Sequence, residues 1–345
     1  MQERRRLLER WRQGGAVALV TLVRVEGSSY RRAGARMLVC ADGEYVGGIS
    51  GGCLEAEVLR RAAWKVRSGA VVERFSTLFD DTTEMPYGLG CGGTLYLLLE
   101  PVDTPECTAL MEAMEASLRG ETCAVTTVLP QEGRPLRRSF AAMAEGLSEW
   151  NADEVYCERL EAPQRLLLCG AGNDAQPMVS LAVQLGWSVT VVDGRAQWAR
   201  AERFAGAERV LAATTLEGIE VGESDAVVLM SHSYEQDRAW LTAVLPRRPQ
   251  YLGLLGARHR SALLLSEAAA ELRWELSRVC EHVFAPVGLD LGGDGAESIA
   301  LATIAEIHAC CEGRLGHSHR MTPAMIAEQI AKGGASRYLE AQCAL

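Results

Sequence analysis

One glycine-rich loop constrains the second half of this chain more than any other feature. The run Gly170-Ala171-Gly172-Asn173-Asp174-Ala175 directly follows the apolar segment Arg165–Cys169 and opens a segment of helical spacing over Ala175–Leu185. A second apolar segment, Ser188–Val192, leads into Asp193, which stands 21 residues after Gly172. A GxGxx(G/A) run between strand and helix, with an acid about 20 residues later, predicts the first crossover of a Rossmann-like domain.

The same loop predicts a nucleotide or dinucleotide site. Gly170 would allow the tight turn, Gly172 would let backbone approach a pyrophosphate, and Asp193 would accept hydrogen bonds from a ribose hydroxyl. Two interpretations stay open, because a Rossmann-like crossover can also fold without binding a nucleotide. In addition, Asp174 brings a carboxylate to the helix entrance, where it would compete with a phosphate for the free N–H groups.

Strand and helix patterns divide the chain into two α/β parts. Residues 164–315 alternate between helix-length segments and apolar strands, which predicts a parallel sheet covered on both faces; the later strand candidates are Ala226–Met230, Tyr251–Leu255 and His282–Pro286. Residues 1–130 are predicted to be a mixed α/β domain with antiparallel strands, because Asp42-Gly43 marks a hairpin turn. Weak periodicity over residues 131–163 suggests the linker between the two domains. Residues 316–345 are predicted to form a helical tail.

Charge, hydropathy and cysteine usage exclude several classes of protein. The net charge of −10 argues against general nucleic-acid binding, and no apolar run approaches the roughly 20 residues of a membrane span. The eleven cysteines are irregularly spaced and do not have the pattern of a disulfide framework, and the N-terminal segment is charged. We therefore expect the protein to reside in a reducing cytoplasm. A homodimer is the default assembly.

The first half carries three loops rich in glycine, and two of them contain a cysteine. They are Gly27–Met37, Gly47–Glu55 and Gly88–Gly93, with Cys53 at a predicted helix start and Cys91 flanked by glycines. A helix N-terminus lowers the pKa of a thiol and favours the thiolate. Ser28, Arg31 and Arg36 add donors for an anion, and Gly52 permits close approach of backbone.

Together these residues predict a sulfur-lined pocket that accepts an anion. Two sulfurs with arginines suit a thiolate-rich, phosphate-bearing ligand better than a zinc ion, which takes four ligands. Inert burial remains the alternative for Cys53 and Cys91, and it is the expectation for the other cysteines: Cys40, Cys107, Cys123, Cys157, Cys169, Cys280, Cys310, Cys311 and Cys343.

The ordered motifs resemble the XdhC/CoxI family of accessory proteins for molybdenum hydroxylases of the xanthine dehydrogenase and CO dehydrogenase types. The matching pieces are Gly27-Ser28 through Arg31, Gly34–Met37, Ser50-Gly51-Gly52-Cys53-Leu54-Glu55, Gly90–Gly93, Gly170-Ala171-Gly172, Val191-Val192-Asp193, Tyr251–Gly256 and Pro286–Asp290. The resemblance spans about residues 15–310. Departures from the family pattern stand at Tyr30, at Asn173-Asp174 and at Ser231-His232-Ser233.

The resemblance implies a chaperone rather than an enzyme. Such a protein would bind molybdenum cofactor, protect it while a cysteine desulfurase supplies a terminal sulfur, and help insert it into the apo-hydroxylase. On this interpretation we assign Cys53 and Cys91 to contacts with the molybdenum or its dithiolene region. Arg31 and Arg36 would hold phosphate, and the Rossmann-like half would bind a nucleotide or part of the pterin.

Two other functions remain open. An NAD(P)-dependent oxidoreductase would use the glycine loop and a nearby proton donor, for which His232 is the evident candidate. A ligand sensor or scaffold would do no chemistry and would leave the cysteine loops unexplained. Polar residues follow three predicted strands of the second half, so we expect a crevice at their ends; these segments are Ser231–Asp237, Gly253–Arg260 and Gly288–Gly295.

Overall fold

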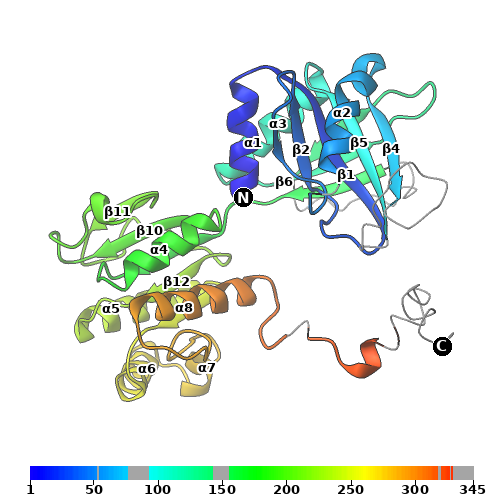
Figure 1. The fold of residues 1–345 in the computed structure, drawn as a ribbon. Helices are drawn as coiled ribbons and strands as arrows, with labels where there is room; N and C mark the ends of the chain where they lie inside the picture. The colour runs from blue at the N-terminus through cyan, green and yellow to red at the C-terminus, as the bar shows by residue number, and fades with distance from the viewer. Residues whose placement is uncertain (53, 77–92, 143–154, 318–319, 327, 329–345) are drawn as a thin grey trace.

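The computed structural model describes residues 1–52, 54–76, 93–142, 155–317, 320–326 and 328 (Figure 1). It confirms the predicted fold class. The first half contains antiparallel sheets, and the second half contains a five-stranded parallel sheet flanked by helices. In the described part of the chain, no helix is both long enough and apolar enough to cross a membrane.

An antiparallel five-stranded sheet forms the centre of the first half. Its order is β3-β2-β1-β5-β4, with β3 at Tyr45–Gly47, β2 at Arg36–Cys40, β1 at Ala16–Gly27, β5 at Gly93–Pro101 and β4 at Val71–Ser76. Gly43 has a positive φ of 86° in the connection between β2 and β3. A turn of this kind favours glycine, so the Asp42-Gly43 pair closes the hairpin as predicted.

Both faces of this sheet are covered, because its strands alternate apolar side chains between two cores. Val20 and Leu22 of β1 pack with α2 (Glu55–Lys65) on one face, and Leu19 packs on the other with residues of α1 and α3. Helix α1 spans Gln2–Arg12 and α3 spans Pro105–Leu118. The alternation of side chains along β1 therefore determines which helices pack on each face of the sheet.

A second, three-stranded sheet lies beside the first, with the order β7-β6-β8. Strand β6 (Cys123–Val128) pairs with β7 (Arg137–Ala141) and with β8 (Val155–Leu160). Strands β7 and β8 fall within the segment 131–163 that the sequence suggested as a linker, so this segment builds part of the first half. Its weak periodicity agrees with β7, in which three of the five residues are exposed.

The second half is a parallel sheet of order β11-β10-β9-β12-β13, in which β9 pairs with both β10 and β12. The strands are β9 (Arg165–Cys169), β10 (Ser188–Asp193), β11 (Arg209–Ala212), β12 (Ala226–Leu229) and β13 (Tyr251–Leu254). Because the strand order reverses between β9 and β12, a crevice is expected at their carboxyl ends.

Helices cover both faces of this sheet, as Figure 1 shows. One core includes residues of α4 and α8, and the other includes residues of α5, α6 and α7. These helices are α4 (Ala175–Gln184), α5 (Tyr234–Val244), α6 (Arg258–Leu272), α7 (Leu276–Cys280) and α8 (Ala296–Cys311).

Two details of the second half differ from the sequence expectation. The predicted strand His282–Pro286 makes only a single bridge, in which Phe284 pairs with Gly253. After this bridge the Val287 N–H still donates to the carbonyl oxygen of Leu254 at 3.2 Å, and the Ala285–Pro286 bond is cis. Strand β11 was not predicted, because its four residues include an exposed Arg209 and carry too little apolar pattern.

We predict that the ion pair between the two sheets of the first half is essential for stability. Arg138 of β7 donates from Nη1 and Nη2 to the Glu100 carboxylate of β5 at 2.7 Å and 2.6 Å, and both side chains are buried. Arg138→Ala would leave the Glu100 charge buried and unpaired, so it should lower the free energy of unfolding by about 3–5 kcal/mol. Urea unfolding measures this loss, with the exposed neighbour changed in Arg137→Ala as the control. Equal effects of the two substitutions would contradict the prediction.

Candidate functional site

The glycine-rich loops of the first half start from neighbouring ends of the central strands. Gly27, the last residue of β1, is the register partner of Gly93, the first residue of β5. A Cβ atom on Gly93 would collide with the carbonyl oxygen of Ser28, so only glycine permits this close approach. The chain therefore leaves β1 at Ser28 directly beside the point where the loop that precedes β5 returns.

The loop after β1 also contacts the loop that precedes α2. The ring of Tyr30 lies against Gly51, where an added Cβ would sit 3.3 Å from the ring carbon Cγ. Tyr30 is nevertheless 77% exposed, so its other face is open to a ligand or partner. Thus Ser28 and Tyr30 bring the loop after β1 against Gly51 and against Gly93, the first residue of β5, at one end of the sheet.

The loop over residues 50–54 is held by the buried carboxylate of Glu55. Its Oε1 accepts hydrogen bonds from the backbone N–H groups of Ile49 (3.0 Å) and Ser50 (2.8 Å), and Oε2 accepts one from the Ser50 hydroxyl. The Ser50 Oγ in turn accepts from the N–H groups of Gly52 and Leu54 at 3.2 Å and 3.1 Å. Residue 53 is therefore flanked on both sides by backbone that side chains fix in place.

These hydrogen bonds keep Glu55 ionised. Burial by itself would raise the pKa of this carboxyl group, but the bonds from the Ser50 hydroxyl and the nearby backbone N–H groups outweigh burial and lower the pKa below its usual value. An ionised Glu55 accepts from three donors at once, which a protonated carboxyl group could not do.

Cys53 and Cys91 lie outside the described residues, and their assignment as molybdenum contacts stays a prediction. Gly52, next to Cys53, has a positive φ of 108° and is exposed. Among the cysteines that the structure describes, burial raises the pKa of the Cys107 and Cys169 thiols. These two thiols remain protonated and inert at neutral pH. No three His, Cys, Asp or Glu side chains of the described chain lie close enough together to hold a metal ion.

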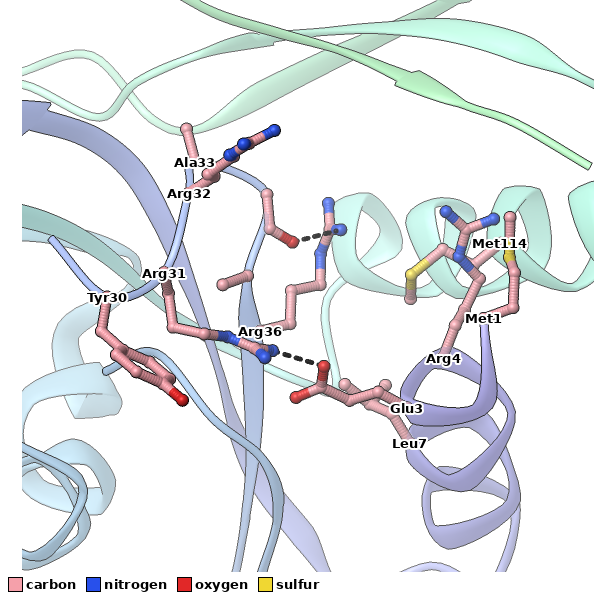
Figure 2. A pocket seen from close by; sticks show the side chains of 12 residues that line it. Met1, Glu3, Arg4, Leu7, Tyr30, Arg31, Arg32, Ala33, Arg36 and Met114 are labelled. Carbon is pink, nitrogen blue, oxygen red and sulfur yellow. Dashed lines mark hydrogen bonds and ion pairs between the residues drawn. The ribbon is translucent and has the colours of Figure 1, made fainter. Parts of the chain in front are cut away.

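The predicted phosphate-binding arginines line a cavity of about 430 Å³ between α1 and the loop after β1 (Figure 2). Arg31 forms an ion pair with Glu3 of α1, and Arg36 forms one with Glu158 of β8. Arg36 also donates from Nη1 to the carbonyl oxygen of Gly34 at 3.2 Å. The structure thus brings Arg31 and Arg36 together, but it engages each of them with an acid of the chain itself.

The glycine loop of the second half is a tight turn between β9 and α4. Gly170 has a φ of 140°, and a Cβ there would collide with the carbonyl oxygen of Met230 after β12. Buried Asp193 accepts from Ala171 N at 2.7 Å, and from the N, Nε and Nη2 atoms of Arg195 at 2.8, 2.9 and 2.7 Å. Burial opposes its charge, but these bonds, that of the Arg195 side chain foremost, lower the pKa of Asp193.

A crevice lies at the carboxyl ends of these strands, where the topology predicts it. It encloses about 540 Å³ and is lined by residues that include Gly194, Arg195, Thr214, Ser231, His232 and Gln236. His232 has a positive φ of 61°, and its ring lies over Gly172, where an added Cβ would be 3.2 Å from Nε2. The same nitrogen is 3.9 Å from Asp174 Oδ2.

Contacts within the chain already surround the residues that are predicted to bind a nucleotide. Asp193 already accepts four hydrogen bonds inside the chain, so a ribose hydroxyl would have to replace one of them. His232 and Asp174 stand beside Gly172, where a pyrophosphate would approach. Gly170, Gly172 and Asp193 therefore have clear structural roles, and their role in binding a nucleotide stays a prediction.

Sequence reasoning missed two residues of the first half. Glu55 belongs to the motif Ser50–Glu55, but no role was assigned to it from the sequence. Its position two residues after Cys53, in the first turn of a helix, was the signal that could have indicated one. Arg4 belongs to a basic run that predicts an amphipathic helix and nothing more. Only the fold places it beside Arg31 and Arg36.

Comparisons with known proteins agree with the motifs. Residues 10–76 match the model of the XdhC and CoxI family, and residues 166–307 match the model of the XdhC Rossmann domain. A relative in Bacillus subtilis (strain 168), which is named as a probable xanthine dehydrogenase subunit, is 29% identical over 313 residues; these are 84% of this chain and 91% of the relative. The molybdenum cofactor insertion chaperone PaoD of Escherichia coli (strain K12) is 27% identical over 300 residues, which cover 85% of this chain and 83% of PaoD.

A solved structure shares the fold. The crystal structure of a xanthine dehydrogenase from Bacillus halodurans superimposes with a TM-score of 0.78 at 24% identity. The match covers 94% of this chain and 99% of that chain, so the two-part architecture is common to both over nearly their full lengths.

We predict that Glu55→Gln weakens the fold at neutral pH. The amide nitrogen of glutamine would face backbone donors, so the substitution should lower the free energy of unfolding by about 1–3 kcal/mol. Because the folded-state pKa of Glu55 lies below its usual 4.5, this stabilisation is full above pH 4.5 and is lost as the pH falls through the folded value. Urea unfolding between pH 3 and 7 should show the two curves converging in acid, whereas the exposed control Glu112→Gln should follow wild type throughout.

We also predict unequal effects of alanine at the two glycines of the second-half loop. Gly170→Ala combines a strained φ with a collision against backbone, so it should cost about 2–4 kcal/mol. Gly172→Ala meets only the ring of His232, which is 56% exposed and can move, so its cost should be below about 1 kcal/mol. Thermal unfolding of both variants measures the difference, and similar losses would show that the loop is not held as described.

Proposed function

Since the chain belongs to the XdhC and CoxI family, we propose that it is an accessory chaperone that binds molybdenum cofactor and inserts it into a molybdenum hydroxylase of the xanthine dehydrogenase type. The proposal draws on the names of two relatives, one named as part of a xanthine dehydrogenase, the other as a cofactor insertion chaperone. Molybdenum cofactor is the cargo of this protein rather than a resident group.

The observation that supports the proposal is the meeting of described glycine-rich segments at one end of the first sheet, around Ser28, Gly51 and Gly93. Gly93 lies against Ser28, and Gly51 lies against Tyr30. Glycine-rich backbone at such a place lets a bulky ligand approach N–H groups closely, and the Glu55 network fixes the loop before binding. A loop that is ordered in advance loses less conformational entropy when the ligand binds.

Cys53 and Cys91 are the residues that we assign to the cargo. In the sequence, Cys53 directly follows Gly52, and Cys91 stands two residues before Gly93; Gly52 and Gly93 are both described. Thiolates are soft ligands that suit a molybdenum–sulfur centre better than oxygen donors do. In this role the chain would shield the reactive end of the cofactor and would not itself catalyse a reaction.

We further propose two partner proteins and one assembly. A cysteine desulfurase would supply the terminal sulfur while the cofactor is bound, and an apo-hydroxylase would receive the finished cofactor. The exposed ring of Tyr30 next to Gly51 is a suitable contact for either protein, because aromatic side chains are enriched at interfaces. A homodimer remains the assembly that we expect.

We predict that alanine at either assigned cysteine weakens cargo binding. Anaerobic titration of the purified full-length chain with molybdenum cofactor should show saturable binding. Cys53→Ala or Cys91→Ala should weaken it about tenfold or more, which corresponds to about 1.4 kcal/mol. The matched control is Cys280→Ala, because Cys280 is an exposed thiol at the end of α7, in the other half of the chain.

The outcomes separate the role from the site. Binding by wild type that neither substitution weakens would overturn the assignment of the two cysteines and leave the chaperone role standing. Failure of wild type to bind the cofactor at all would overturn the role itself.

A further inference from the structure

The cavity in Figure 2 holds more positive charge than its acids neutralise. Arg31 is matched by Glu3, and Arg36 is matched by Glu158. Arg4 also lines the cavity, yet it donates only to neutral oxygens: the Ser117 hydroxyl at 2.7 Å and the carbonyl oxygen of Glu161 at 2.9 Å. Among the described acidic side chains, none forms an ion pair with Arg4.

Two further observations favour an anion at this place. Burial and the nearby charge of Arg36 lower the pKa of Arg4, the charges of Glu158 and Glu161 raise it, and the balance leaves the pKa lowered. In addition, Arg36 is only 8% exposed, and its Nε has no hydrogen-bond partner. A buried donor without a partner is destabilising unless a ligand satisfies it.

Both polar and apolar side chains line the cavity. The arginines stand opposite one another, Arg4 on α1 and Arg31 and Arg36 on the loop after β1 and on β2. Met1, Leu7 and Met114 also line the space. Its volume of about 430 Å³ falls within the range of about 300–1,000 Å³ that is usual for small-molecule sites, so it has room for an organic group as well as an anion.

We propose that this cavity binds the phosphate group of a small phosphate monoester, with Arg4, Arg31 and Arg36 as donors and Glu3 as an internal anion that the ligand replaces. Arginine matches phosphate because its planar guanidinium presents paired donors. Glu3 occupies Arg31 in the structure described here, so the ligand must compete with its carboxylate. The resemblance already assigned Arg31 and Arg36 to the phosphate of the cofactor, so this inference rests in part on the proposed function; it adds Arg4 and Glu3 to that phosphate site and does not depend on Cys53 or Cys91.

The test is isothermal titration calorimetry of the full-length chain with glycerol 3-phosphate and, separately, with inorganic phosphate. Arg4→Gln should weaken binding about tenfold, because it removes one charge-assisted donor. Glu3→Gln should tighten binding at least about threefold, because it frees Arg31; this gain cannot result from misfolding. The matched control is Arg12→Gln, on the same helix, where Arg12 pairs with Glu115 and does not line the cavity.

Each outcome decides the proposal. Tighter binding of glycerol 3-phosphate than of inorganic phosphate supports a monoester site, whereas equal or weaker binding assigns the cavity to free phosphate and overturns the monoester. Lack of saturable binding of both probes, or an Arg12→Gln loss equal to that of Arg4→Gln, overturns the site. The cofactor titration compares variants of Cys53 and Cys91, and these titrations compare variants of Arg4 and Glu3, so failure of one proposal can be distinguished from failure of the other.

Discussion

The pairing of β1 with β5 is the constraint on which the first half depends. It joins residues about 75 positions apart in the sequence and ends at Gly27 and Gly93, where the backbones approach too closely for any side chain. This end of the pairing places the loop after β1 beside Gly93, where β5 begins. The opposite faces of β1 then decide which side α2 occupies and which side α1 and α3 occupy. The candidate site and the arginine cavity both follow from this one antiparallel register.

The arginines of the cavity could be predicted from the sequence, but the acids that pair with them could not. The composition of the loop Gly27–Met37 correctly suggested an anion-accepting pocket, and Arg31 and Arg36 do line a cavity. Their partners Glu3 and Glu158 come from a helix 28 residues before Arg31 and a strand 122 residues after Arg36. No local pattern indicates such pairs, since they depend on the tertiary fold alone.

The fold could be predicted further than the site, for a physical reason. Strands such as β9 and β10 and helices such as α4 are encoded by periodicity within a few residues, and they appear where expected. Segments whose pattern is weak are harder to predict: the segment 131–163, expected as a linker, contains β7 and β8, and the His282–Pro286 run forms one bridge instead of a strand. Similarly, the role of Glu55 depends on three donors that only the folded loop brings to its carboxylate.

The ion pair that connects the two sheets of the first half limits which substitutions the chain can accept. Arg138 and Glu100 are both buried and hold each other through two hydrogen bonds. Removal of either charge leaves the other charge buried and unpaired. An apolar pair of similar volume, by contrast, can be as stable as the ion pair. A single substitution at one position is therefore disfavoured, and the two positions are free to diverge only together. Such coupling makes the small sheet and the large sheet depend on each other in sequence as well as in packing.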